Sequence, residues 1–167
     1  MESRIEPLAS ALPAVAWRWD AETDILSGAF KVNRTGTGLT GTVELTDEVG
    51  SIAVVDVHNG VICGVDIVVW PEVGTASELP VPDKLTDGRV VVTAKAAKSG
   101  VTSLEINAPL TVTTNRSETV FHLCIGPRRE VDAVRVADHL LVEVDRSGGL
   151  AGFWLTGVPP FPAEEDL

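Results

Sequence analysis

Closely spaced carboxylates near the N-terminus are the first residues with the chemistry to bind a ligand. Asp20, Glu22 and Asp24 alternate along a short segment, and oxygen ligands of this kind are those that Ca²⁺ and Mg²⁺ prefer. The segment lacks the longer loop, with its central glycine and closing bidentate glutamate, of the common calcium-binding motif. A solvated acidic turn is therefore the favoured interpretation, and a cation site at these residues is the alternative.

His122 and Cys124 form a second pair of candidate metal ligands. They are two residues apart in a segment expected to be a strand, so both side chains should lie on one face. A zinc site needs a full set of ligands at suitable spacing, and the chain has no Cys-x-x-Cys or His-x-x-x-His. His122 is therefore expected to be a structural histidine, and neither a metal nor an organic cofactor is predicted.

Acidic residues also flank the turn 58–60, in which Asn-Gly readily adopts the positive φ of a tight hairpin. Asp56 and Asp66 are expected to face each other across this hairpin, and paired carboxylates can serve as acid and base. The alternative is that both point to solvent. No Gly-x-Ser-x-Gly motif occurs, and the glycine-rich run 36–41 lacks the strand–loop–helix context of a dinucleotide site. No catalytic residue is assigned, and a non-enzymatic protein is favoured.

Tryptophans are the candidate partner-binding residues. Trp17 and Trp19 are two apart on one expected strand, and Trp70 and Trp154 lie near the ends of two others. An indole has an apolar body and one donor, so it suits a core or an interface. Core packing is expected for most of them, whereas an exposed pair would mark a partner surface.

Strands must position all of these residues, because valine dominates the apolar runs and valine favours a pleated surface over a helix. No segment carries a helical stripe of ten or more residues. The segments 89–96 and 102–107 are expected to pair as a hairpin around 98–100. The expected strands are 14–19, 24–32, 42–46, 51–57, 61–70, 89–96, 102–107, 110–114, 119–125, 131–136, 140–144 and 150–158.

A weak duplication organises these strands. Residues 17–26 align with 112–121, and 62–67 align with 150–155, which places Gly64 and Gly152 at the same position. A glycine inside a strand marks a bulge or a close backbone approach. The sequence therefore predicts an all-β fold of two similar antiparallel half-units, packed as a pseudo-twofold sandwich or barrel.

The predicted organisation is one compact domain with five parts. They are a lead-in at 1–13, a first β half-unit at 14–70, a proline-rich connector at 71–88, a second half-unit with an extra hairpin at 89–158, and an acidic tail at 159–167.

The segments 17–26 and 55–67 resemble the DUF2283 family of small bacterial domains of unknown function. The shared pattern is an apolar strand, the run Asp-x-Glu-x-Asp at 20–24, a second apolar strand, and an apolar–acidic alternation before a glycine-containing turn. The resemblance covers residues 15–70 and, more faintly, 110–158, where the acidic turn is absent. It implies a small β domain and brings no activity with it.

Composition limits the partners. The 167 residues carry a net charge of −11, whereas nucleic acids and anionic membranes require clustered basic residues. Neither a signal peptide nor a transmembrane helix is expected, which predicts a cytoplasmic protein. Cys63 and Cys124 are expected to be reduced core residues, although a single bridge between them is an open alternative.

Two functions remain at this point. A non-enzymatic protein-binding or assembly module is favoured, with a protein partner or self-association and with no nucleic acid or membrane. The alternative is a small-ligand- or metal-binding protein, or an enzyme, with a site between the two halves.

Overall fold

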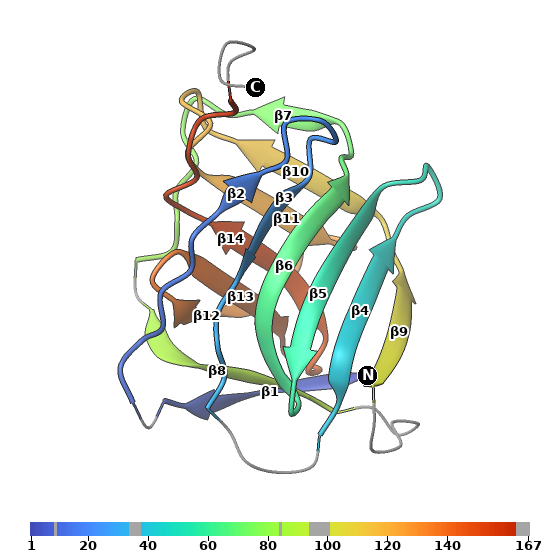
Figure 1. Ribbon diagram of the computed structural model, residues 1–167, viewed down its shortest axis with the longest axis vertical. Coiled ribbons are helices and arrows are strands. Elements are labelled where there is room, and N and C mark those ends of the chain that lie inside the picture. Colours follow the sequence, from blue (N-terminus) through green and yellow to red (C-terminus); the bar gives the residue numbers. More distant parts are fainter. Residues whose placement is uncertain (9, 34–37, 84, 94–100, 163–167) are drawn as a thin grey trace.

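The computed structural model describes residues 1–8, 10–33, 38–83, 85–93 and 101–162. These residues form an all-β protein whose sheet curls into a half-barrel (Figure 1). None of the described residues belongs to a helix, so no helix there has the length and apolar character to cross a bilayer. The strands are β1 (Glu2–Pro7), β2 (Arg18–Trp19), β3 (Leu26–Ala29), β4 (Thr40–Thr46), β5 (Ile52–His58), β6 (Val61–Val69), β7 (Val73–Thr75), β8 (Thr86–Thr93), β9 (Val101–Asn107), β10 (Leu110–Thr114), β11 (Phe121–Ile125), β12 (Val131–Ala137), β13 (Leu140–Asp145) and β14 (Leu150–Leu155).

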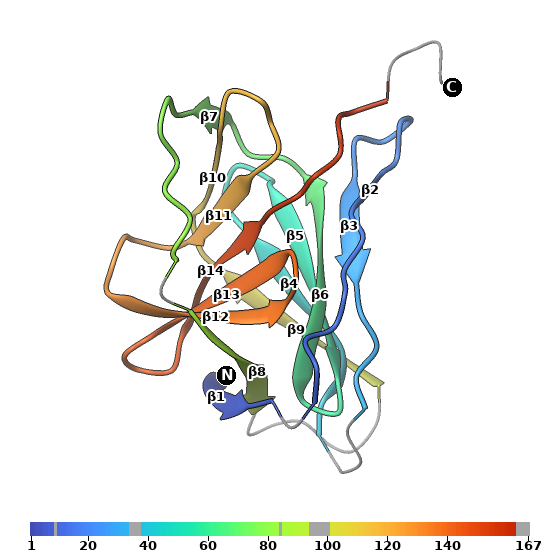
Figure 2. The ribbon, with the colours of Figure 1, turned by 90° about the vertical axis from the view of Figure 1, so that its left-hand side faces the viewer.

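A single hydrogen-bonded path, β7-β10-β11-β14-β13-β12-β8-β6-β5-β4-β9, runs through the sheet. Strand β3 joins the side of β6, β2 joins β3, and β1 joins β8. The curl places β3 to β6 opposite β10 to β14, so that the two groups face each other as layers (Figure 2). Strand β8 is the only strand on this path between the two groups.

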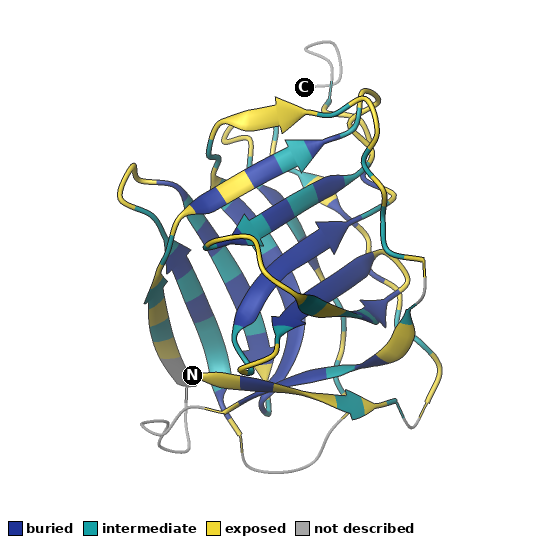
Figure 3. Cartoon of the chain, turned by 180° about the vertical axis from the view of Figure 1, so that it is seen from behind, coloured by how far each residue is buried: buried dark blue, intermediate teal, exposed yellow. Residues whose placement is uncertain are grey.

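Alternation explains why these segments are strands with a buried inner face. Along β5, Ala53, Val55 and Val57 are buried, while the residues between them are half-buried. Strands β13 and β14 are buried along almost their whole length, as the dark bands in Figure 3 show. The largest fully buried side chains include Phe153, Leu26, Leu45, Ile62, Ile67, Leu123, Leu140 and Leu155.

Two groups of five strands have the same neighbour order. The first runs β2-β3-β6-β5-β4 and the second β10-β11-β14-β13-β12, with every neighbouring pair antiparallel. In each group the first two strands and the last three are consecutive in the chain.

The two glycines that the duplication aligns occupy matching places in these groups. Gly64 lies opposite Asp56 and Gly152 opposite Glu143, and each is preceded by a residue that the register skips. A Cβ at Gly64 would lie 2.6 Å from the carbonyl oxygen of Gly28, and one at Gly152 would lie 2.6 Å from that of Leu123. The expected bulge and close backbone approach are therefore confirmed at both glycines.

Most local expectations hold. The turn Asn59-Gly60 has φ values of 49° and 83°, as the tight β5–β6 hairpin requires. The expected strands 110–114 and 119–125 form the hairpin β10–β11, and parts of 14–19 and 24–32 form the hairpin β2–β3.

One expected pairing is wrong, and two segments with no expected strand contain strands. Strands β8 and β9 do not pair with each other, because β9 lies parallel to β4 while β8 bonds β1, β6 and β12. The lead-in contains β1, which pairs along its whole length with β8 despite its polar sequence. The connector contains β7 and the start of β8. Residues 98–100, the run 163–167 and part of 36–41 lie outside the described residues.

Candidate functional site

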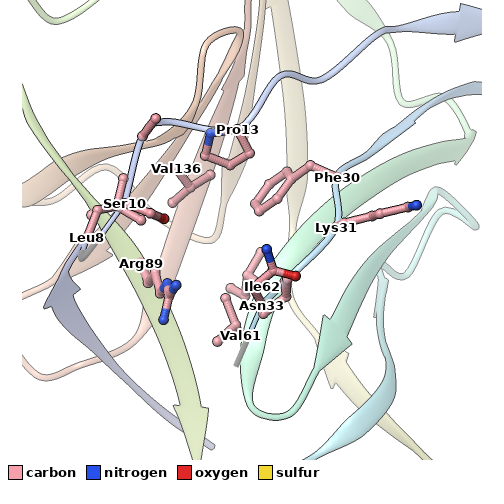
Figure 4. A pocket seen from close by; sticks show the side chains of 13 residues that line it. Leu8, Ser10, Pro13, Phe30, Lys31, Asn33, Val61, Ile62, Arg89 and Val136 are labelled. Carbon is pink, nitrogen blue, oxygen red and sulfur yellow. The ribbon is translucent and has the colours of Figure 1, made fainter. Parts of the chain in front are cut away.

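A cavity of about 220 Å³ lies where the two layers meet beside β8 (Figure 4). Its floor comes from the start of β6, from Gly88 and Arg89 of β8 and from the end of β12. The rest of its wall comes from Leu8, Ser10, Ala11 and Pro13, which precede β2, and from residues 30–33, which follow β3. The residues that line it therefore come from five separate parts of the chain.

Apolar side chains make most of the wall. Phe30 points into the cavity and faces Pro13 and Val136 across it (Figure 4). Val61 and Ile62 form the base, and their relative exposures of 1% and 0% show that the hydrophobic core supports them from behind. An apolar molecule in this space would contact packed, pre-positioned side chains on several sides.

Polar groups converge from the other side. Arg89 and Ser10 stand on one wall and Asn33 on the opposite one, whereas Lys31 extends away from the cavity (Figure 4). The cavity lining that the structure describes contains no Asp, Glu, His or Cys. It therefore offers hydrogen-bond donors and a positive charge, and its described lining has no carboxylate, imidazole or thiol to act as a general base.

Arg89 differs from the other arginines. Arg4, Arg129, Arg135 and Arg146 each form an ion pair with a carboxylate. Within the described part of the chain, the guanidinium of Arg89 has neither an ion pair nor a hydrogen bond. Among the described residues, the other arginines without such a partner, Arg18, Arg116 and Arg128, are exposed, while Arg89 is half-buried. The Arg89 guanidinium therefore presents its five N–H donors beside the cavity without an acceptor among the described residues.

Asp56 and Asp66 lie on the outer face of the sheet. The predicted direct pairing is wrong: Asp56 is opposite Gly64, and Asp66 is opposite Val54, so the two carboxylates are diagonal neighbours. The bulge explains the change, because skipping Cys63 brings Asp56 onto the same face as Asp66.

This placement raises both pKa values. Burial, and then the charge of Asp56, raises the pKa of Asp66 to about 6, and burial raises that of Asp56. The same two causes raise the pKa of the Cys63 thiol to about 11. An open hollow lined by Arg18 and Ser27 adjoins Asp66, and its described lining contains no histidine or cysteine.

His122 pairs with a residue that sequence reasoning missed. Its Nε2 lies 2.6 Å from Oε1 of Glu143, and its ring stacks on Trp154 with a centroid distance of 4.1 Å. Glu143 is only 8% exposed, and the missing side chain at Gly152 makes room for its carboxylate. The sequence feature that could have indicated this pair is Glu143, which stands between apolar residues in strand β13. The Trp154 Nε1 is buried without a partner.

The candidate metal ligands are not brought together. Cys124 directs its thiol to the Gly126 carbonyl, away from the His122–Glu143 pair. Asp20 caps its own turn by accepting a hydrogen bond from the Glu22 amide, and Asp24 lies exposed beyond it. In the described ranges, no three His, Cys, Asp or Glu residues are arranged to hold a metal ion. Cys63 and Cys124 are both free thiols.

The four tryptophans are engaged within the chain. Trp17 is buried and donates to the carbonyls of His139 and Thr156. Trp19 stacks on Trp70 at 5.6 Å, and this pair packs with Phe121 and Phe161. Both tryptophan rings are half-buried, so this aromatic cluster packs residues next to β2, β6 and β11 against one another. Binding of a partner by the tryptophans stays a prediction.

No protein-family model matches this chain, and no curated protein matches it. The resemblance to the DUF2283 family therefore stays a prediction.

Proposed function

We propose that this protein binds a small organic molecule in the cavity between the two layers and does not transform it. The observation that carries the proposal is the mostly apolar cavity with a half-buried arginine at its wall that has no partner among the described residues. Without a carboxylate, imidazole or thiol in the described lining, the cavity supports binding better than catalysis.

Size limits the ligand. Pockets for drug-sized molecules measure roughly 300–1,000 Å³, and this cavity holds about 220 Å³. The proposed ligand therefore has one compact body, such as a single ring or a short branched chain.

We further infer that the two five-strand groups arose by duplication and pack as pseudo-twofold half-units. The shared neighbour order and the matching bulges before Gly64 and Gly152 support this. A duplicated unit replaces a homodimer by a single chain, and the seam between the copies is a common place for a site. The cavity lies at that seam, beside β8.

A thermal-shift screen with small fragments tests the binding proposal. A fragment at a hundred times its dissociation constant stabilises a protein by about 2.7 kcal/mol, which is a shift of roughly 5–10 °C for a chain of this size. Ser10→Trp fills the mouth of the cavity and should abolish the shift. Ser77→Trp places the same side chain on an exposed position outside the cavity lining and should leave it intact. Equal shifts in both variants would mean that the fragment binds elsewhere.

A protein-binding or assembly role is the second candidate, and the free edge of β9 favours it. Strand β9 bonds β4 along one side, and no described strand covers its other side. An uncovered edge is a template for another strand. Replacing the exposed Ser103 and Glu105 by lysine should prevent such pairing. Light scattering across a concentration series checks for self-association, and an unchanged mass in the parent protein would contradict it.

A further inference from the structure

We infer that the cavity selects an organic monocarboxylate with a compact apolar body, and that Arg89 anchors its carboxylate. This inference rests on the proposed binding function and adds the chemical class of the ligand.

The sign of the charge comes first. The chain carries −11 overall, yet the charged side chains in the described lining of the cavity are Lys31 and Arg89, both cations. An acidic surface repels anions at long range, so an anion would bind here only through contact with a local cation. Because Lys31 extends away, Arg89 is the cation positioned to contact a bound molecule (Figure 4).

The geometry of the head group comes second. A guanidinium presents two parallel N–H donors that match the two oxygens of a carboxylate. Arg89 has no acceptor for these donors among the described residues, and Ser10 on the same wall and Asn33 on the opposite wall are available to hydrogen-bond a bound carboxylate (Figure 4). A phosphate would need more positive charge than one arginine provides, so a single negative charge fits best.

A neighbouring carboxylate sets the limit of this attraction. Glu6 is the cross-strand partner of Arg89 in the β1–β8 register. Its Oε2 is 2.9 Å from an Arg4 guanidinium nitrogen, so it is paired elsewhere, although its charge remains close to the site. Removing that charge should therefore strengthen the binding of an anion.

The body of the ligand follows from the walls. Phe30, Pro13 and Val136 converge on the space beyond the polar groups, above the buried Ile62. A flat or branched apolar group would fill this space, and an aromatic ring can pack on the face or edge of Phe30.

Three probes of one shape test the charge requirement. Benzoate, benzamide and benzamidinium share a ring and a planar head group and differ in charge. Calorimetric titration should show benzoate binding at least about tenfold more tightly than benzamide, a difference of about 1.4 kcal/mol. Benzamidinium should bind least. Loss of benzoate binding in the Ser10→Trp variant would show that benzoate binds in the cavity.

Variants assign the anchor. Arg89→Gln should reduce benzoate affinity to that of benzamide while leaving benzamide affinity unchanged, which also shows that the variant is folded. Arg135→Gln removes an exposed arginine that pairs with Asp87, and it should have no effect. Glu6→Gln should tighten benzoate binding.

Failure of the two proposals can be distinguished. Equal cavity binding of all three probes would overturn the carboxylate class and keep the binding function. Benzoate affinity that survives Arg89→Gln would overturn the role of Arg89. If neither these probes nor any fragment binds, both proposals fail.

Discussion

Replacing Gly152 by alanine should destabilise the fold strongly, because the added Cβ would collide with atoms of two neighbouring strands. A Cβ there would lie 2.5 Å from Oε1 of Glu143 and 2.6 Å from the carbonyl oxygen of Leu123. A carboxylate can rotate away, but Leu123 belongs to β11, which is hydrogen-bonded to β14 at this point. Relief therefore requires a shift of the backbone.

The expected cost has two parts. Overpacking in a filled interior costs about 1–3 kcal/mol, and displacing the Glu143 carboxylate weakens its bond to His122, a buried charged hydrogen bond whose loss costs roughly 1–3 kcal/mol. We expect a loss of about 3 kcal/mol, which lowers the melting temperature by roughly 6–12 °C for a chain of this size.

Urea and thermal unfolding measure this loss, with two comparisons. Gly50→Ala is the control, because nothing lies within 4 Å of its Cβ position, so only the strain of its φ of 95° remains. That strain should cost about 1 kcal/mol. In a Glu143→Ala background the carboxylate contact is gone, so Gly152→Ala should still cost about 1–3 kcal/mol through the backbone contact alone. A Gly152→Ala protein as stable as its parent would refute the reasoning.

Three further predictions concern titrating groups. Asp66→Asn should stabilise the protein near neutral pH. The pKa of Asp66 is higher in the folded state than in the unfolded state, so its contribution to stability is present below the unfolded pKa and is lost as pH rises through about 6. Chemical unfolding measured against pH should therefore show a flatter profile in the variant. Asp145→Ala should cost about 2 kcal/mol in the same assay, because this carboxylate binds Arg129 and the Ser147 and Gly149 amides. Those hydrogen bonds hold the pKa of Asp145 in the folded state well below its usual value. The stability that Asp145 contributes is therefore present above its unfolded pKa and is lost as pH falls towards its folded pKa. A parent protein whose stability does not fall with acid would contradict this role of Asp145. Cys63, with a pKa raised to about 11, should resist a thiol-specific reagent in a Cys124→Ser protein until the fold opens, and rapid labelling would contradict its burial.

The local part of this fold was predictable from sequence. The Asn59-Gly60 hairpin and the bulges beside Gly64 and Gly152 follow from residues close together in the chain. Long-range pairing was not predictable, because a strand pattern specifies which face is buried and does not specify the neighbour. Residues 89–107 read as a hairpin, whereas β9 completes the sheet beside β4.

The candidate site was predictable only in outline. A site between the halves was one of two expectations, but its residues were not identified. Arg89, Phe30 and Val136 come from separate segments, and none belongs to a sequence motif. The sequence feature that could have indicated the site is the single arginine before the valine run 90–92. In the same way, the glutamate among the apolar residues of β13 could have indicated the partner of His122.

The bonding of β8 has a mechanical consequence. It contacts β6 through the single residue pair Val61–Val91 and β12 through two pairs at its other end, whereas its pairing with β1 is continuous. A force that pulls the two layers apart therefore acts on the few backbone hydrogen bonds that β8 makes with β6 and β12. We expect the layers to separate first at β8. The cavity lies beside these bonds, while the shared hydrophobic core joins the layers elsewhere, so local opening at β8 is expected to change the cavity before the rest of the fold.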